Sequence, residues 1–141
     1  VERYSDKVIE ADKTNAYNFN LARISFEKGE YKIAMRHLLR VTYEDAFYAS
    51  TARILLIKCY YELNDEMPFQ SYCASLLQFL KRSKDFTKQR VENNMHFISF
   101  VRKLQNQRLK ANKQTLNKMK TSIESSSTIE KDWLLKKLSE I

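Results

Sequence analysis

Apolar residues recur three to four positions apart on both sides of Gly29, the only glycine in the chain. Before the glycine they are Tyr17, Leu21, Ile24 and Phe26, and after it they are Tyr31, Ala34, Leu38 and Val41. This spacing predicts two amphipathic helices, and their short connection predicts an antiparallel hairpin. Glycine suits the connection because a helix often ends on a left-handed residue, a conformation that costs little only without a Cβ atom.

The same periodicity continues along the chain and predicts five segments. The first three are a trailing helix of a preceding repeat (residues 1–12), a first hairpin (13–46) and a divergent second hairpin (47–82), with a loop expected at 12–15 before the first hairpin. The last two are a long basic helix with a short helix (83–122) and a loop with a capping helix (123–141). Pro68 is expected to open a helix after a connection longer than usual, because proline is tolerated in a first turn. Thr87 is expected to cap the long helix, and Ser127 with Glu130 has the form of a capping box.

The composition supports an all-α fold. Hydrophobic residues make up 43% of the 141, only one glycine and one proline occur, and no sustained period-two alternation predicts strands. No apolar run approaches the length of about 20 residues that crosses a bilayer, so no membrane insertion is expected. A cytoplasmic setting is the default expectation, and the start at Val1 in mid-pattern predicts a piece of a longer chain.

The first hairpin resembles a tetratricopeptide repeat (TPR). The family's alternation of large and small positions is matched by Leu21, Ala22, Phe26, Gly29, Tyr31 and Ala34. A shift of about 34 residues, the length of that repeat, superposes Leu21 on Leu55 and Phe26 on Tyr60, which predicts a second copy. The resemblance implies antiparallel hairpins stacked as a short superhelix. We expect the last helix to cap the end of the stack, with Trp133, the only tryptophan, as its anchor, and the alternative is an exposed binding role for Trp133.

From about Tyr60 onward the chain also resembles uncharacterised bacterial helical-repeat proteins. The phrases that carry this second resemblance are CYYELND, LLQFLKR, FISFVRKL and KDWLLKKL. It covers about half of the chain and implies no activity.

The TPR resemblance assigns a candidate groove to the first helix of each hairpin. Two stripes at i, i+4 and i+8 line it, Phe19, Arg23 and Glu27 on one helix and Arg53, Ile57 and Tyr61 on the next. An apolar and aromatic stripe flanked by arginines suits a peptide or a partner helix, with the arginines available for carboxylates. The alternative is that Phe19, Ile57 and Tyr61 pack against a neighbouring unit or against the long helix.

The net charge of +8 is concentrated in one segment. Residues 81–120 carry +10, whereas residues 1–80 and 121–141 carry −1 each. The candidate cations are Lys81, Arg82, Lys84, Lys88, Arg90, Arg102, Lys103, Arg108, Lys110 and Lys113. They could contact nucleic-acid phosphates or an acidic partner. The alternative is a solvated helix face, because no nucleic-acid motif accompanies them.

Little in the sequence indicates catalysis or metal binding. Cys59 and Cys73 lie fourteen residues apart without metal-ligand spacing, and we expect both to be core-facing free thiols. Glu62, Asp65 and Glu66 lie close together, but no nucleophile–base pair accompanies them. The sequence therefore predicts no enzyme, cofactor or metal. It predicts a protein–protein interaction module, with nucleic-acid or acidic-partner binding through residues 81–113 as the alternative.

Overall fold

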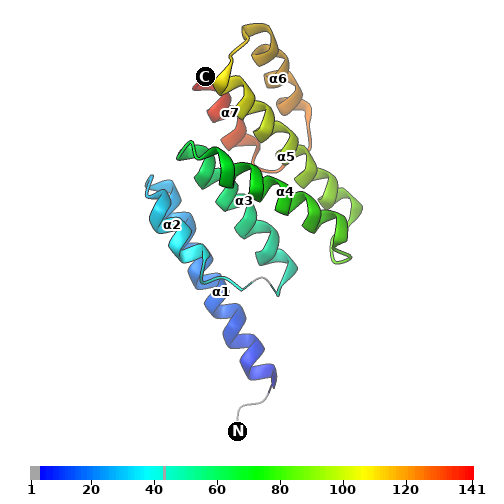
Figure 1. The fold of residues 1–141 in the computed structure, drawn as a ribbon. Coiled ribbons are helices and arrows are strands. Elements are labelled where there is room, and N and C mark those ends of the chain that lie inside the picture. Colours follow the sequence, from blue (N-terminus) through cyan, green and yellow to red (C-terminus); the bar gives the residue numbers. More distant parts are fainter. Residues whose placement is uncertain (1–3, 43) are drawn as a thin grey trace. The chain divides into compact units, whose positions relative to one another are not determined.

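The computed structural model describes residues 4–42 and 44–141, and at positions 4, 5, 8, 11 and 12 it describes the backbone alone. Every regular element in this part of the chain is an α-helix, which confirms the all-α prediction (Figure 1). The helices are α1 (Tyr4–Glu27), α2 (Tyr31–Leu38), α3 (Ala46–Glu62), α4 (Glu66–Arg82), α5 (Lys88–Leu109), α6 (Lys113–Ser125) and α7 (Lys131–Ser139). None of these described helices combines the length and the apolar character needed to cross a bilayer.

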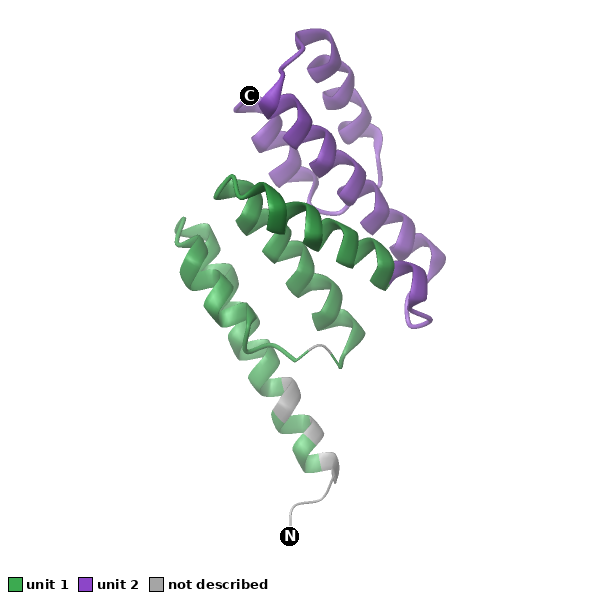
Figure 2. Cartoon of the chain, viewed as in Figure 1, with its two compact units in different colours: residues 1–79 green, residues 80–141 purple. Residues whose placement is uncertain are grey.

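The chain divides into two compact units, residues 1–79 and residues 80–141 (Figure 2). In the first unit α1 and α2 form an antiparallel hairpin, and α3 packs against both of them (Figure 1). In the second unit α5, α6 and α7 pack against one another. Each unit therefore includes a contact between non-consecutive helices, α1 with α3 and α5 with α7.

Gly29 ends α1 in the way that the sequence predicts. Its φ angle is +78°, in the left-handed region. The backbone N–H of Glu30 donates to the carbonyl of Ser25, and the N–H of Gly29 donates to the carbonyl of Phe26, both at 2.9 Å. These two bonds form a Schellman motif, which satisfies carbonyl groups that the end of a helix leaves open.

The turn after α3 repeats this motif with asparagine in place of glycine. The N–H of Asp65 donates to the carbonyl of Tyr60 at 3.0 Å, and the N–H of Asn64 donates to that of Tyr61 at 3.1 Å. Asn64 has a φ of 53°, which asparagine tolerates better than most residues. The prediction of a longer connection here is wrong, because three residues join the helices in both hairpins. α4 begins at Glu66, so Pro68 lies within its first turn instead of opening it.

The two hairpins repeat at 35 residues, and the 34-residue alignment is therefore out of register by one. Buried positions that correspond at this spacing are Ala22 and Ile57, Phe26 and Tyr61, Ala34 and Phe69, Leu38 and Cys73, and Val41 and Leu76. The reason lies in α3, where every residue from Ile54 to Cys59 is buried. This helix is apolar around most of its circumference, so an alignment that pairs large apolar residues with one another can be made in more than one register.

The loop predicted at residues 12–15 is wrong, and so is the segment boundary placed there, because α1 runs through these residues without a break. Asn15, expected at a helix start, is only 3% exposed. Its Nδ2 donates to Oγ1 of Thr42 at 2.8 Å, and its Oδ1 accepts from the Thr42 N–H at 2.9 Å. Asn15 therefore ties the middle of α1 to the segment that follows α2.

Side-chain caps begin α5 and α6 in the second unit. The Thr87 hydroxyl accepts from the Arg90 N–H at 3.2 Å, which confirms the predicted cap of α5. Asn112 caps α6 in the same way, through the Thr115 N–H at 3.0 Å. These contacts replace backbone partners that the first turn of a helix lacks.

The capping box predicted for the last helix is wrong. α7 begins at Lys131, and the preceding Glu130 is left-handed, with a φ of 57° and no side-chain cap. The chain before it is already held in place, because the Thr128 N–H donates to Ser126 Oγ at 3.1 Å and the Ile129 N–H donates to the Asn93 carbonyl at 3.4 Å. These contacts fix residues 128 and 129 against the Ser126 side chain and α5 before the helix can start.

Candidate interaction surfaces

The structure buries two of the six residues of the predicted groove. Ile57 is fully buried and Tyr61 is 4% exposed, with its ring 6.2 Å from that of Phe69. Assigning these two residues to a binding groove is therefore wrong, because a partner could not reach them. The physical reason is that α3 is buried around most of its circumference, since even Ile54 and Lys58, which match Phe19 and Arg23 at the spacing of 35, are 6% and 7% exposed.

Arg53 makes structural contacts within the first unit. Its Nε donates to Ser75 Oγ at 3.0 Å, and one terminal nitrogen donates to the Ala49 carbonyl at 2.9 Å. The guanidinium also lies 4.9 Å from the centre of the Phe79 ring. Arg53 therefore joins α3 to α4, and two of its donors are used within the first unit.

The other predicted stripe remains at the surface. Arg23 and Glu27 are exposed, and Phe19 is half-buried. The Phe19 ring lies edge-on to Tyr48 at 6.3 Å, and Tyr48 lies edge-on to Phe47 at 5.2 Å. We call these five residues the aromatic surface. It combines a continuous row of three rings from α1 and α3 with one cation and one carboxylate along α1.

Sequence reasoning missed Phe47 and Tyr48. Their backbone N–H groups donate to the Asp45 carboxylate at 2.8 and 3.3 Å, so the cap of α3 fixes the backbone that carries both rings. The sequence does contain one signal for them, a pair of adjacent aromatic residues in the first turn after the capping residue Asp45. What the sequence could not give is the position of Phe19 beside them, because that depends on how α1 packs against α3.

The basic segment is exposed but is not one continuous cluster. Eight of the ten candidate cations are exposed, and Arg102 and Arg108 are half-buried. Along α5, Arg90 and Arg102 are twelve residues apart, which is about 18 Å at the rise of a helix. Some of the cations rest on neighbouring side chains, with Arg90 5.0 Å from the Phe86 ring centre and Lys103 5.9 Å from that of Phe100. The segment therefore presents two cationic groups, residues 81–90 and 102–113.

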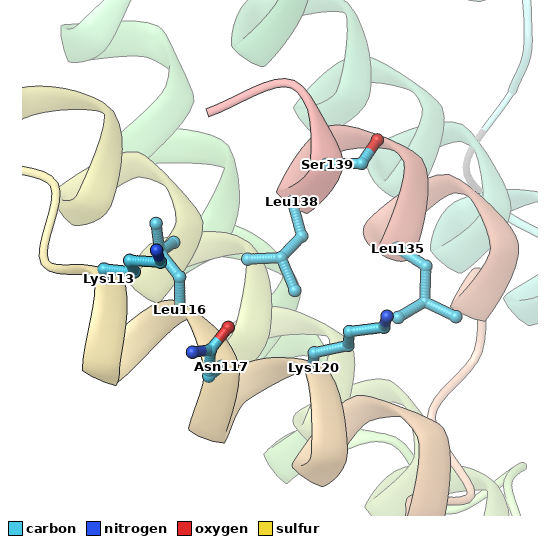
Figure 3. A pocket seen from close by; sticks show the side chains of 7 residues that line it. All are labelled: Lys113, Leu116, Asn117, Lys120, Leu135, Leu138 and Ser139. Carbon is cyan, nitrogen blue, oxygen red and sulfur yellow. The ribbon is translucent and has the colours of Figure 1, made fainter.

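A third surface, which the sequence did not suggest, is a hollow between α6 and α7. Its volume is about 320 Å³. Lys113, Leu116, Asn117 and Lys120 line it from α6, and Leu135, Leu138 and Ser139 line it from α7 (Figure 3). We call it the α6–α7 hollow. Its leucines come from two helices joined by a five-residue connection, so only the tertiary structure brings them together.

Both cysteines are buried and neither forms a disulfide, as the sequence predicts. Burial raises the pKa of the Cys59 thiol to about 12, nearby Lys58 opposes this rise and Glu62 adds to it. A thiol with such a pKa is protonated and unreactive near neutral pH. In the described part of the chain, no group of three or more histidine, cysteine, aspartate or glutamate side chains is placed to hold a metal ion.

No protein-family model, curated protein or solved structure matches this chain.

Proposed function

We propose that the chain is a TPR-like helical-repeat module that binds a peptide or a partner protein through the aromatic surface. The observation that carries this proposal is the row of three rings, in which Phe47 is 45% exposed although each ring contacts its neighbour edge-on. Exposed aromatic side chains are common anchors of protein interfaces, because they bury a large apolar area at little entropic cost.

The recurrence of the hairpins supports the repeat assignment. The two turns share one hydrogen-bond motif, and the buried positions of both hairpins correspond at a single spacing of 35 residues. In this proposal the hairpins stack as a TPR-like superhelix, and α7 caps the stack. The first helices of the two hairpins, α1 and α3, both contribute to the aromatic surface, as the resemblance implies.

Charge gives the surface a preference among peptides. Arg23 and Glu27 follow Phe19 at one-turn intervals on α1, and both are exposed. If a bound peptide places an aromatic or leucine side chain against the rings, the residues that follow along the peptide lie near Arg23 and then near Glu27. We therefore expect it to carry an acidic residue near Arg23 and a basic residue near Glu27.

A displayed library of random peptides selected on the full chain tests the proposal. Selected peptides should shift backbone NMR signals around Phe19, Phe47 and Tyr48. Phe47→Ala should weaken their binding about thirtyfold or more, because an exposed aromatic anchor that becomes buried in an interface contributes about 2 kcal/mol or more. Met67→Ala is the matched control, since Met67 is an exposed apolar residue outside the surface. The proposal fails if both substitutions weaken binding equally, or if the shifts lie elsewhere.

The second candidate function is electrostatic binding of nucleic acid or an acidic partner by residues 81–113. The exposure of eight cations in that segment favours it, because contacts with phosphates need accessible charges. The division of the cations into two groups about 18 Å apart along α5 suits an extended polyanion better than a single phosphate. The salt dependence of binding separates this function from recognition at the aromatic surface.

A further inference from the structure

The α6–α7 hollow has the shape of a groove between two helix faces. On α6 the lining positions 113, 116, 117 and 120 follow the i, i+3, i+4, i+7 spacing of one face, and positions 135, 138 and 139 do the same on α7. Figure 3 shows the side chains of Leu135 and Leu138 projecting toward the α6 side. A surface built this way accepts side chains that are themselves spaced along a helix.

The chemistry of the lining is apolar with cationic residues on one helix. Leu116, Leu135 and Leu138 supply the apolar part, and Lys113 and Lys120 stand one at each end of the α6 lining. Both lysines are exposed. α6 carries no acidic residue before Glu124, near its end. A ligand of the hollow therefore meets leucine side chains and two positive charges about two turns apart.

The nearest acidic residue beyond α7 does not cancel this charge. Glu140 follows Ser139, but its carboxylate lies 3.1 Å from Nζ of Lys137 and forms an ion pair with it. The lysine of that pair is largely buried and its carboxylate is half-exposed. Because no carboxylate lines the hollow, its cations keep their attraction for a negatively charged partner.

We infer that the α6–α7 hollow binds an amphipathic helix of a partner protein, with leucine-sized side chains on one face and aspartate or glutamate beside them. The volume of about 320 Å³ is at the low end of ligand pockets, which suits a few side chains inserted from above. Nucleic acid fits less well, because no aromatic residue lines the hollow for base stacking. This site is built from residues of the second unit and shares none with the aromatic surface, so the inference does not depend on the proposed function.

Two synthetic peptides and the full chain test the inference. One peptide carries leucines at helical spacing with glutamates beside them, and the other replaces each glutamate by lysine. The glutamate peptide should shift backbone NMR signals of α6 and α7, and it should bind about tenfold or more tightly than the lysine peptide. The combined Lys113→Glu and Lys120→Glu substitution should weaken the glutamate peptide about tenfold and strengthen the lysine peptide.

Lys118→Glu is the control for position, because Lys118 is exposed on the same helix but does not line the hollow. It should leave the affinity of the glutamate peptide within about twofold, as expected for a charge outside the contact. The inference is overturned if the two peptides bind equally, if Lys118→Glu acts like the double substitution, or if the shifts lie outside α6 and α7. It is also overturned if dodecanoate or an RNA oligonucleotide shifts these helices and the glutamate peptide does not.

Discussion

Gly29 and Asn64 hold the same place in the two hairpins of the first unit, and both are left-handed. An added Cβ at Gly29 would meet no heavy atom within 4 Å, so space does not explain the glycine. The backbone angle does, because a Cβ atom in this conformation approaches the following carbonyl oxygen. After glycine, asparagine is the residue that most often adopts left-handed backbone angles, and Asn64 does so in the second hairpin.

Gly29→Ala should lower the free energy of unfolding by about 1–2 kcal/mol, the usual cost of a left-handed residue with a side chain. Gly29→Asn is the matched comparison and should cost less than alanine, because Asn64 already occupies the equivalent turn. Urea unfolding followed by circular dichroism measures both. Equal losses for the two variants would show that the backbone angle does not govern this position.

Cys59 gives a prediction about reactivity. Burial raises its pKa from 9.0 to about 12, so at mildly alkaline pH the folded thiol yields about a thousandth of the thiolate of an unfolded one. We expect iodoacetamide to label Cys59 in urea and to leave it unlabelled in buffer, as measured by mass spectrometry. Rapid labelling of the folded protein would contradict the burial of this side chain.

The same pKa shift predicts a change in stability with pH. A thiol whose pKa is raised on folding contributes stability that is complete below pH 9 and is lost as the pH rises toward 12. The free energy of unfolding should therefore fall over this range, and it should fall less in Cys59→Ala. Comparing the two proteins by urea unfolding removes the contribution of lysine and tyrosine groups that titrate in the same range. Parallel profiles would contradict the shift.

At the scale of elements, α1 is the clearest case in which a local signal was overridden by a tertiary contact. Residues 12–15 are polar and suit a helix start, yet they contain no glycine or proline to stop a helix. Asn15 makes its hydrogen bonds with Thr42, 27 residues away, and not with its own helix. A sequence pattern cannot distinguish these two uses of asparagine.

Asn15→Ala should lower the free energy of unfolding by about 1–3 kcal/mol, because it removes two hydrogen bonds that join α1 to the segment after α2. Asn20→Ala is the control, since Asn20 is exposed on the same helix. Its effect should stay within about 0.5 kcal/mol. Urea unfolding measures both, and similar losses for the two variants would mean that the Asn15 contact adds little.

The elements show what local pattern could and could not predict. Gly29 and Thr87 were identified because each signal acts within its own turn of helix. Ser127 was misassigned because contacts to Ser126 and Asn93 decide where α7 begins. The register of α3 was misassigned because a helix that is apolar on nearly every side carries no sharp periodicity. Helix caps that act within one turn could be predicted from the sequence. The register of α3 and the start of α7 could not, because tertiary packing determines both.

At the scale of the whole molecule, charge and apolar surface are separated along the chain. The excess of +10 lies in residues 81–120, whereas the rings of the aromatic surface lie between positions 19 and 48. The sequence predicted the basic segment because charge can be counted without a structure. It predicted only part of the aromatic surface and none of the hollow, since each is assembled by helices that meet in three dimensions.

This separation predicts how salt affects binding of a labelled single-stranded RNA oligonucleotide. The test variant reverses four exposed lysines of the basic segment, Lys84, Lys88, Lys103 and Lys110, to glutamate. If each contacts a phosphate, the slope of log affinity against log salt should fall by about three, because each contact contributes about 0.7. Fluorescence anisotropy at several salt concentrations measures the slope.

The control variant has the same net charge and reverses four exposed lysines of the first unit, Lys7, Lys13, Lys28 and Lys32. Its slope should stay close to that of the unchanged protein, because these residues lie outside the basic segment. Equal slopes for the two variants would indicate that the affinity for RNA depends on the net charge of the protein and not on the position of its cations. Absence of binding at low salt would exclude single-stranded RNA as the ligand of residues 81–113.

The matching turns after α1 and α3 have a consequence for engineering. Each is a three-residue connection held by main-chain bonds, so the side chains of Lys28 and Glu30, or of Leu63 and Asp65, take no part in closing it. Exchanging Lys28-Gly29-Glu30 for Leu63-Asn64-Asp65 should therefore yield a chain that still folds. The two turns should therefore be exchangeable, and the residues at their tips could be replaced by tags or attachment points without redesign of the helices that they connect.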